Sequence, residues 1–174
     1  MRSDAGSEPA PERAQEHRRL ALAAGIVLGV IALDQLTKAW AVAALSDGPE
    51  SILGTTLELR LNRNTGGAFS LFQEITPVLA VLAVVVAVVL VRVIHRTRDR
   101  VIVVALSLVL AGAVGNLIDR IARSPGFFRG AVIDFIGVGR FPTFNVADSA
   151  ITIGAVLLVV WGWRRGVEPA SDAD

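Results

Sequence analysis

Four apolar stretches, each long enough to cross a bilayer, constrain this chain more than any other feature. They cover about residues 20–45, 75–94, 101–120 and 144–163 of a chain of 174 residues. A hydrocarbon core of about 30 Å is spanned by about 20 mainly apolar residues in a helix. Helices also satisfy their own backbone hydrogen bonds where no water is present. We therefore predict an all-α integral membrane fold with four transmembrane helices, in one domain of residues 18–165.

Composition supports the membrane class and excludes several kinds of chemistry. Hydrophobic residues make up 53% of the chain, and the mean hydropathy is +0.58. The absence of cysteine excludes disulfides, thiolate catalysis and zinc–thiolate sites. The two histidines, His17 and His95, lie in arginine-rich segments, so we expect no histidine-based metal site or triad.

The segments outside the four spans are polar. Residues 1–17 lack an apolar period and predict a disordered tail, and residues 166–174 form a short acidic tail. Leu57, Leu59 and Leu61 alternate with polar residues, which indicates a short half-buried strand. We expect a small extracytoplasmic β-element around it, and we interpret residues 121–143 as a loop.

Arginines predict the orientation. They precede the first span, fill residues 92–100 and follow the fourth span, so the positive-inside rule puts both termini in the cytoplasm. Polar residues of four distant segments then gather at the outer face: Asp34, Lys38, Asn64, Asn116, Asp119, Arg120, Asp134, Asn145 and Asp148. The first span could instead be a signal peptide cleaved at the A-x-A pattern of residues 41–43. We favour a retained helix, because Asp34 and Lys38 would otherwise separate the apolar core from the cleavage site.

Asp134 and Asp148 are the candidate reactive groups. Each lies among apolar residues, and a Gly/Pro-containing bend separates them. An ionisable group at the head of an apolar span indicates function, and two neighbouring carboxylates can share a proton and act as acid and base. Alternatively, the N-x-x-D spacing of Asn145 and Asp148 could simply cap the last helix. The residues alone leave both interpretations open.

The other polar residues suggest support for such a site. Asp34 and Lys38 are spaced i,i+4 and can pair, and the ammonium of Lys38 could snorkel to the far membrane boundary. Asn116, Asp119 and Arg120 share one helix face, where an Asp119–Arg120 pair is possible, and Asn64 could be an ordinary turn residue. A dyad of Lys38 with Ser70 or Ser149 is a further alternative.

Five short blocks in this order resemble the lipoprotein signal peptidases, the signal peptidase II family. They are D-Q-L-T-K at 34–38, N-T-G-G-A-F at 64–69, G-N-L-I-D-R at 115–120, V-I-D-F at 132–135 and F-N-V-A-D at 144–148. The resemblance covers residues 20–163. Gly67 departs from it, because the family often has alanine there, and residues 124–128 lengthen the loop before Asp134.

The resemblance implies a membrane aspartyl endopeptidase in the bacterial cytoplasmic membrane. It would cut diacylglyceryl-modified prolipoproteins just before the lipidated cysteine, with Asp134 and Asp148 as the catalytic pair. It implies no metal or organic cofactor, and we expect membrane lipids but no nucleic acid as partners, and a monomer. The residues expected to bind substrate or support the site are Asp34, Lys38, Asn64, Gly66, Asn116, Asp119, Arg120 and Asn145. The competing class is a small transporter or ion-relay subunit that uses the same charges.

Overall fold

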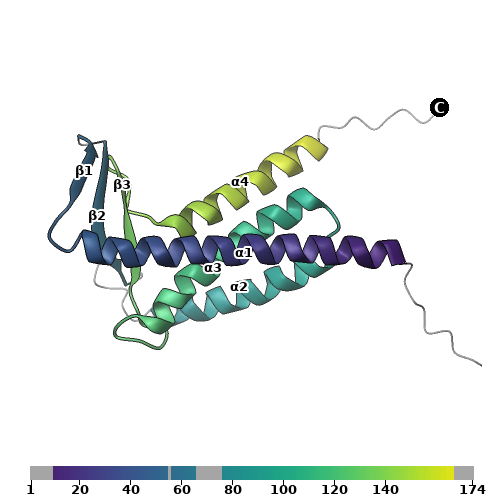
Figure 1. Cartoon of the computed structure of the whole chain (residues 1–174), viewed down its shortest axis with the longest axis horizontal. Helices are drawn as coiled ribbons and strands as arrows, with labels where there is room; N and C mark the ends of the chain where they lie inside the picture. The colour runs from purple at the N-terminus through teal and green to yellow at the C-terminus, as the bar shows by residue number, and fades with distance from the viewer. Residues whose placement is uncertain (1–9, 55, 66–75, 167–174) are drawn as a thin grey trace, which may run out of the picture.

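The computed structural model describes residues 10–54, 56–65 and 76–166, which form four helices and a small sheet at one end of the helical bundle (Figure 1). The helices are α1 (Ala10–Ala44), α2 (Thr76–Arg96), α3 (Arg100–Ala122) and α4 (Val146–Gly166). All four are long and apolar enough to cross a membrane. The predicted fold class, four transmembrane helices with a small β-element, is therefore confirmed.

Helix α1 begins earlier than the sequence suggested. Residues 10–17, which we assigned to a disordered tail, form its first turns. Pro11 is tolerated there because the first turn leaves its backbone N–H groups without helical partners in any case. The alanine, glutamate, glutamine and arginine that follow all have high helix propensity, so the helix extends beyond the apolar segment.

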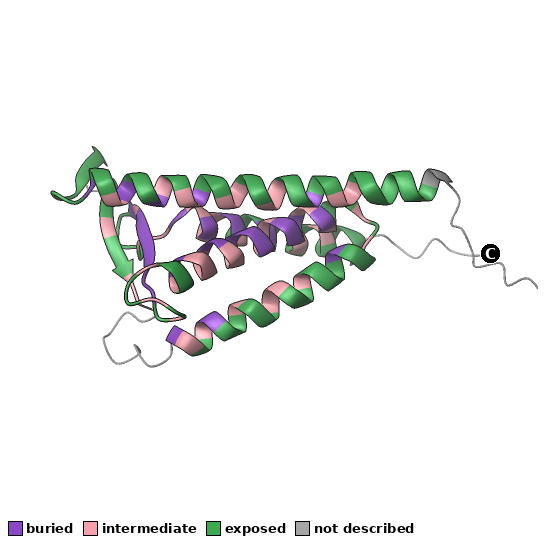
Figure 2. Ribbon diagram, turned by 60° about the horizontal axis from the view of Figure 1, so that its bottom comes forward, coloured by how far each residue is buried: buried purple, intermediate pink, exposed green. Residues whose placement is uncertain are grey.

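Helix α3 is the centre of the bundle and packs against each of the other three helices. It is also the most buried helix (Figure 2). Gly112 lies so close to the backbone of Ala147 in α4 that a Cβ would meet the carbonyl oxygen of Ala147. Gly154 of α4 similarly faces the carbonyl oxygen of Ala105. Small residues thus allow close contact between α3 and α4, as is common between membrane helices.

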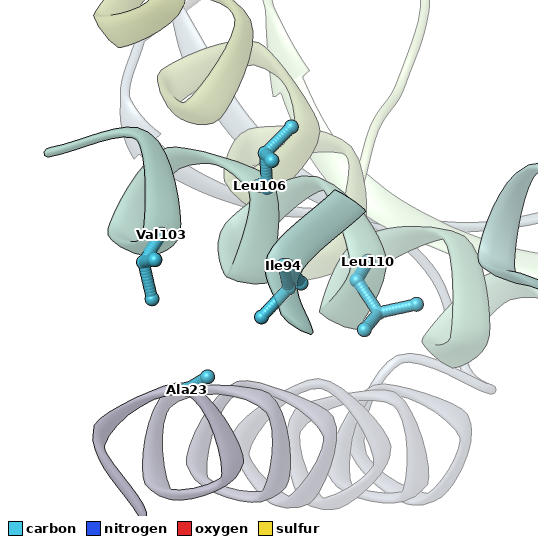
Figure 3. Close-up of a cluster of buried hydrophobic side chains, with 5 residues drawn as sticks. All are labelled: Ala23, Ile94, Val103, Leu106 and Leu110. Atoms are coloured by element: carbon cyan, nitrogen blue, oxygen red, sulfur yellow. The ribbon is translucent and has the colours of Figure 1, made fainter. Parts of the chain in front are cut away.

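The half of the bundle remote from the sheet is held by a cluster of apolar side chains. The cluster consists of Ala23 of α1, Ile94 of α2 and three residues of α3. In Figure 3, Ile94, Val103 and Leu110 point toward Ala23, whereas Leu106 points to the other side of α3. These contacts join α1, α2 and α3.

The sheet has three antiparallel strands in the order β1 (Glu50–Leu53), β2 (Leu57–Asn64) and β3 (Val132–Val138). The predicted strand is therefore present as β2. Ile133 and Phe135 of β3 pack against Ala41 of α1 and Leu45 just after it, and Trp40 meets Phe135 edge to face at 6.1 Å between ring centroids. These contacts fix the sheet on the end of α1.

A backbone hairpin connects the sheet to α4. After β3 the chain turns back, and Phe144 exchanges two backbone hydrogen bonds with Ile136, of 2.9 and 3.0 Å. Asn145 and the start of α4 follow at once. The residues of β3 and the first turn of α4 are therefore held side by side.

Candidate active site

Asp134 lies in the middle of β3, not in a loop as we had predicted. Its Cα pairs with that of Asn62 in β2, and the residue is only 1% exposed. Side chains alternate between the faces of a strand, so Asp134 lies opposite Ile133 and Phe135, which face the apolar cluster against α1. The prediction of a loop was wrong because β3 is short and finds its partner strand far away in the sequence.

Two asparagine amides hold the carboxylate of Asp134. The Asn64 side chain donates to Oδ2 at 3.0 Å, and the Asn145 side chain donates to Oδ1 at 2.7 Å. Burial raises the pKa of Asp134 to about 6, and the charge of Asp148 adds to the rise. The two amide hydrogen bonds and the positive charge of Lys38 act in the opposite direction. Desolvation is the larger effect, so Asp134 binds a proton more readily than an ordinary carboxyl.

Asp148 lies in the first turn of α4 and is half-buried. Asn145 accepts a hydrogen bond from the backbone N–H of Asp148 at 2.9 Å, and Asp148 accepts one from the backbone N–H of Asn145 at 3.2 Å. This reciprocal pair is a capping box, so the capping interpretation of N-x-x-D is confirmed for these two hydrogen bonds. The other oxygen of Asp148 accepts from the Asn116 side chain at 2.8 Å, an interaction that capping does not require.

Asn145 connects the two aspartates. It is fully buried, and its side-chain amide donates to Asp134 while its backbone N–H donates to Asp148. The same amide group also lies 3.2 Å from the side-chain oxygen of Asn116. One residue thus holds carboxylates from a strand and a helix at a common site.

Lys38 is fully buried next to these residues. We had predicted instead that its ammonium would snorkel to the membrane boundary. Its ammonium lies 2.9 Å from Asp34 and 2.8 Å from Asp119, and it donates to Asn116 at 3.0 Å. All three of its donors therefore have an acceptor. The predicted Asp34–Lys38 pair is confirmed. Asp119 pairs with Lys38 and, at 2.7 Å, with Arg123, whereas we had considered Arg120.

Asp34 and Asp119 each extend this network to a backbone group beside a candidate aspartate. Asp34 accepts from the backbone N–H of Ala147, next to Asp148, at 2.9 Å. Asp119 accepts from the backbone N–H of Ile133, next to Asp134, at 3.3 Å. The Lys38 ammonium joins the two, so one buried cation helps to set the relative position of β3 and α4.

The remaining predicted residues take different places. Arg120 donates to the backbone oxygen of Asn116 at 3.5 Å, and its buried Nε has no hydrogen-bond partner among the described residues. Asn64 contacts Asp134 directly and is therefore more than a turn residue. Gly66 lies outside the described residues.

The serine alternative is not supported where it can be examined. The hydroxyl of Ser149 donates to the backbone oxygen of Asn145 at 2.9 Å, whereas the Lys38 ammonium is occupied by three other acceptors. Ser70 lies outside the described residues.

Cleavage of a signal peptide after Ala43 would remove Asp34 and Lys38 from the site.

Sequence reasoning missed Gln35 and Arg123. The Gln35 amide donates to Asp34, to Asp119 and to the backbone oxygen of Gly115, at 3.1, 3.4 and 3.1 Å. Arg123, the residue that follows α3, binds Asp119 of its last turn. The i,i+4 spacing could have indicated Arg123. The sequence indicated a role for Gln35 only weakly, through its position as a polar residue inside an apolar helix.

A mainly apolar hollow of about 460 Å³ opens beside Asp148. It follows one side of α4 and the segment before it, and its walls are Phe141, Pro142, Thr143, Phe144, Asp148, Ser149, Thr152 and Ile153. An extended apolar molecule could lie there with one of its bonds close to the carboxylate.

Comparison with known proteins decides the family. A family model described as signal peptidase (SPase) II matches residues 26–164. The chain belongs to the signal peptidase II family. Lipoprotein signal peptidases from Rhodococcus jostii and Streptomyces coelicolor are 45% and 41% identical to it, over 94% and 92% of this chain and 86% and 78% of theirs. The chain is therefore an aspartic-type protease of a bacterial membrane, and the family gives no support to a transporter or ion relay.

Two solved structures share the fold. Both are described as bacterial membrane enzymes determined by the in meso method, at 2.3 and 1.9 Å resolution. They are 26% and 28% identical, with TM-scores of 0.74 and 0.68. The matches cover 88% and 81% of this chain and 94% and 92% of theirs. The overall fold of this chain is thus shared with two solved bacterial membrane enzymes.

Proposed function

We propose that Asp134 and Asp148 are the catalytic pair of a peptidase that removes signal peptides from prolipoproteins, and that it cuts before a diacylglyceryl-modified cysteine. The observation that carries this proposal is the position of Asn145, which donates hydrogen bonds to both carboxylates. Relatives named lipoprotein signal peptidase support the substrate class.

The two aspartates divide the chemistry between them. Asp134 is the more deeply buried and has its pKa raised to about 6, so it is the better candidate to hold a proton and donate it to the scissile carbonyl oxygen. Asp148 is half-buried and next to the hollow along α4, so it is the better candidate to take a proton from the attacking water. This division follows the general pattern of two carboxylates in different environments.

The polar network serves to fix the relative position of the two carboxylates. Asn64, Asn116 and Asn145 orient the carboxylates, and Asp34, Lys38 and Asp119 fix the backbone beside them. Such supporting residues contribute to catalysis by holding the reactive groups in the correct geometry, although they do not touch the substrate themselves. We also propose that both termini are cytoplasmic, that the site lies near the outer face of the cytoplasmic membrane, and that the monomer is active.

Cleavage of a defined substrate tests the proposal. The purified protein in nanodiscs is mixed with a diacylglyceryl-modified proprotein, and the products are identified by mass. We expect release of the intact signal peptide and a new N-terminal cysteine that carries the lipid. Absence of cleavage, cleavage at another bond, or equal cleavage of the unmodified proprotein would contradict this assignment.

A further inference from the structure

A polar pocket lies at the end of the bundle remote from the two aspartates. It has a volume of about 340 Å³ and is formed by the start of α1, the end of α2 and the start of α3. Its walls are Glu12, Gln15, Glu16, Arg19, His95, Arg96, Arg98 and Arg100. Along α3, Arg100 is sixteen residues from Asn116, which corresponds to about 24 Å. The pocket is therefore separate from the site described above.

The charge of this pocket suits an anion. Four arginines face two glutamates, which leaves an excess of positive charge. Arg19 donates to the backbone oxygen of His95 at 3.3 Å, but its buried Nε has no hydrogen-bond partner within the described part of the chain. A buried guanidinium N–H without an acceptor is unfavourable, and a phosphate oxygen is a suitable acceptor for it.

An apolar groove begins about two turns further into the membrane. It has a volume of about 590 Å³, and its walls are Val27, Ala87, Val88, Val91, Arg92, Leu110 and Val114. Val27 lies eight residues beyond Arg19 on α1, or about 12 Å along the helix. On α2, Val88, Val91 and Arg92 continue into His95 and Arg96 with i, i+3, i+4, i+7 and i+8 spacing, which places them on one helix face.

The same face of α2 therefore lines a cationic pocket at the membrane surface and an apolar groove below it. A phospholipid has the matching order of parts, a phosphate followed by acyl chains. We propose that an anionic phospholipid binds here, with its phosphodiester at Arg19 and Arg96 and one acyl chain along Val88 and Val91. This site requires only that the bundle spans a membrane, whichever surface the pocket faces.

Native mass spectrometry of the delipidated full chain tests the proposal, with phosphatidylglycerol and phosphatidylcholine as probes. We expect phosphatidylglycerol to bind at least roughly tenfold more tightly, since an anionic lipid surface attracts each nearby arginine. The double variant Arg19→Gln/Arg96→Gln should lose at least roughly tenfold in this affinity. The matched control is Arg18→Gln/Arg164→Gln, which removes the same charge from exposed arginines outside both cavities and should change it by less than about twofold.

A second variant tests the groove without a change of charge. Val88→Trp fills the groove and should weaken phosphatidylglycerol binding, while soluble glycerol phosphate should not compete with the lipid. Any of four results would overturn the proposal. They are an equal loss of phosphatidylglycerol affinity in the two double-arginine variants, unchanged binding by Val88→Trp, equal affinity for both lipids, and competition by glycerol phosphate. Peptidase activity of every variant should stay close to that of the parent, so failure of this proposal and failure of the proposed function are distinguishable.

Discussion

Asp148 is at once a helix cap and a candidate catalytic group, and one substitution separates the two roles. Asparagine keeps a side-chain oxygen that can accept from the backbone N–H of Asn145 in this capping box, but an amide cannot exchange a proton with water or with a carbonyl oxygen. We predict that Asp134→Asn and Asp148→Asn insert and fold, yet each loses on the order of 10³-fold or more in the initial rate of signal-peptide release. The double variant should be scarcely worse than either single variant. A single variant within about tenfold of the parent rate would remove that aspartate from the mechanism.

The pKa of Asp134 leads to a pH prediction. If Asp134 supplies the proton, kcat/KM should fall as the pH rises through about 6, where this carboxyl deprotonates. The hydrogen bond from Asn64 favours the charged form, so its removal raises the pKa further. Asn64→Ala should therefore move this limb of the profile to higher pH. The measurement is the pH profile of kcat/KM for both proteins, and a shift to lower pH would contradict the assignment of Asp134 as the acid.

Lys38 neutralises two buried carboxylates, so its loss leaves unpaired charge inside the protein. Breaking a buried ion pair by removal of one partner costs about 3–5 kcal/mol. We predict that Lys38→Met lowers the thermal unfolding midpoint strongly. Lys38→Met/Asp34→Asn should recover part of the loss, because it also removes one of the stranded carboxylates. A double variant less stable than Lys38→Met would show that charge compensation is not the role of Lys38.

At the scale of elements, α3 and α4 hold Asn116 and Asp148 together only because they can pack closely. A Cβ at Gly154 would lie 2.6 Å from the carbonyl oxygen of Ala105, whereas a Cβ at Gly162 on the same helix meets nothing within 4 Å. We predict that Gly154→Ala lowers both the unfolding midpoint and the peptidase rate. Gly162→Ala should be neutral or slightly stabilising, since alanine has the higher helix propensity. Equal effects of the two substitutions would exclude close packing as the cause.

The helices could be predicted from the sequence and β3 could not, for a physical reason. Each helix contains an apolar run that is sufficient by itself to indicate a membrane span. By contrast, β3 has seven residues, with Asp134 among them, and its strand identity depends on pairing with β2 about 70 residues earlier. The start of α1 was missed for a related reason, because its polar helical turns carry no apolar period.

The candidate site was predictable to the extent that its residues occur in recognisable blocks. The blocks placed Asn116, Asn145 and both aspartates in one site, and the contacts of Asn145 agree with this. They could not show that Lys38 is fully buried or that Asp119 pairs with Lys38 and Arg123. Those contacts depend on how α1 and α3 are rotated against each other, which spacing within one helix does not determine.

At the scale of the whole molecule, the orientation in the membrane decides where this chemistry takes place. The absence of cysteine makes the test clean, since single cysteines can be introduced without background. His17 lies near the start of α1 and Ser124 in the loop after α3, and both are exposed. The positive-inside rule places His17 in the cytoplasm and Ser124 outside. We predict that a membrane-impermeant maleimide labels Ser124→Cys in intact spheroplasts and His17→Cys only after lysis. The parent chain should remain unlabelled, and the reverse pattern would put both aspartates at the cytoplasmic face, where a substrate crossing outward would not meet them.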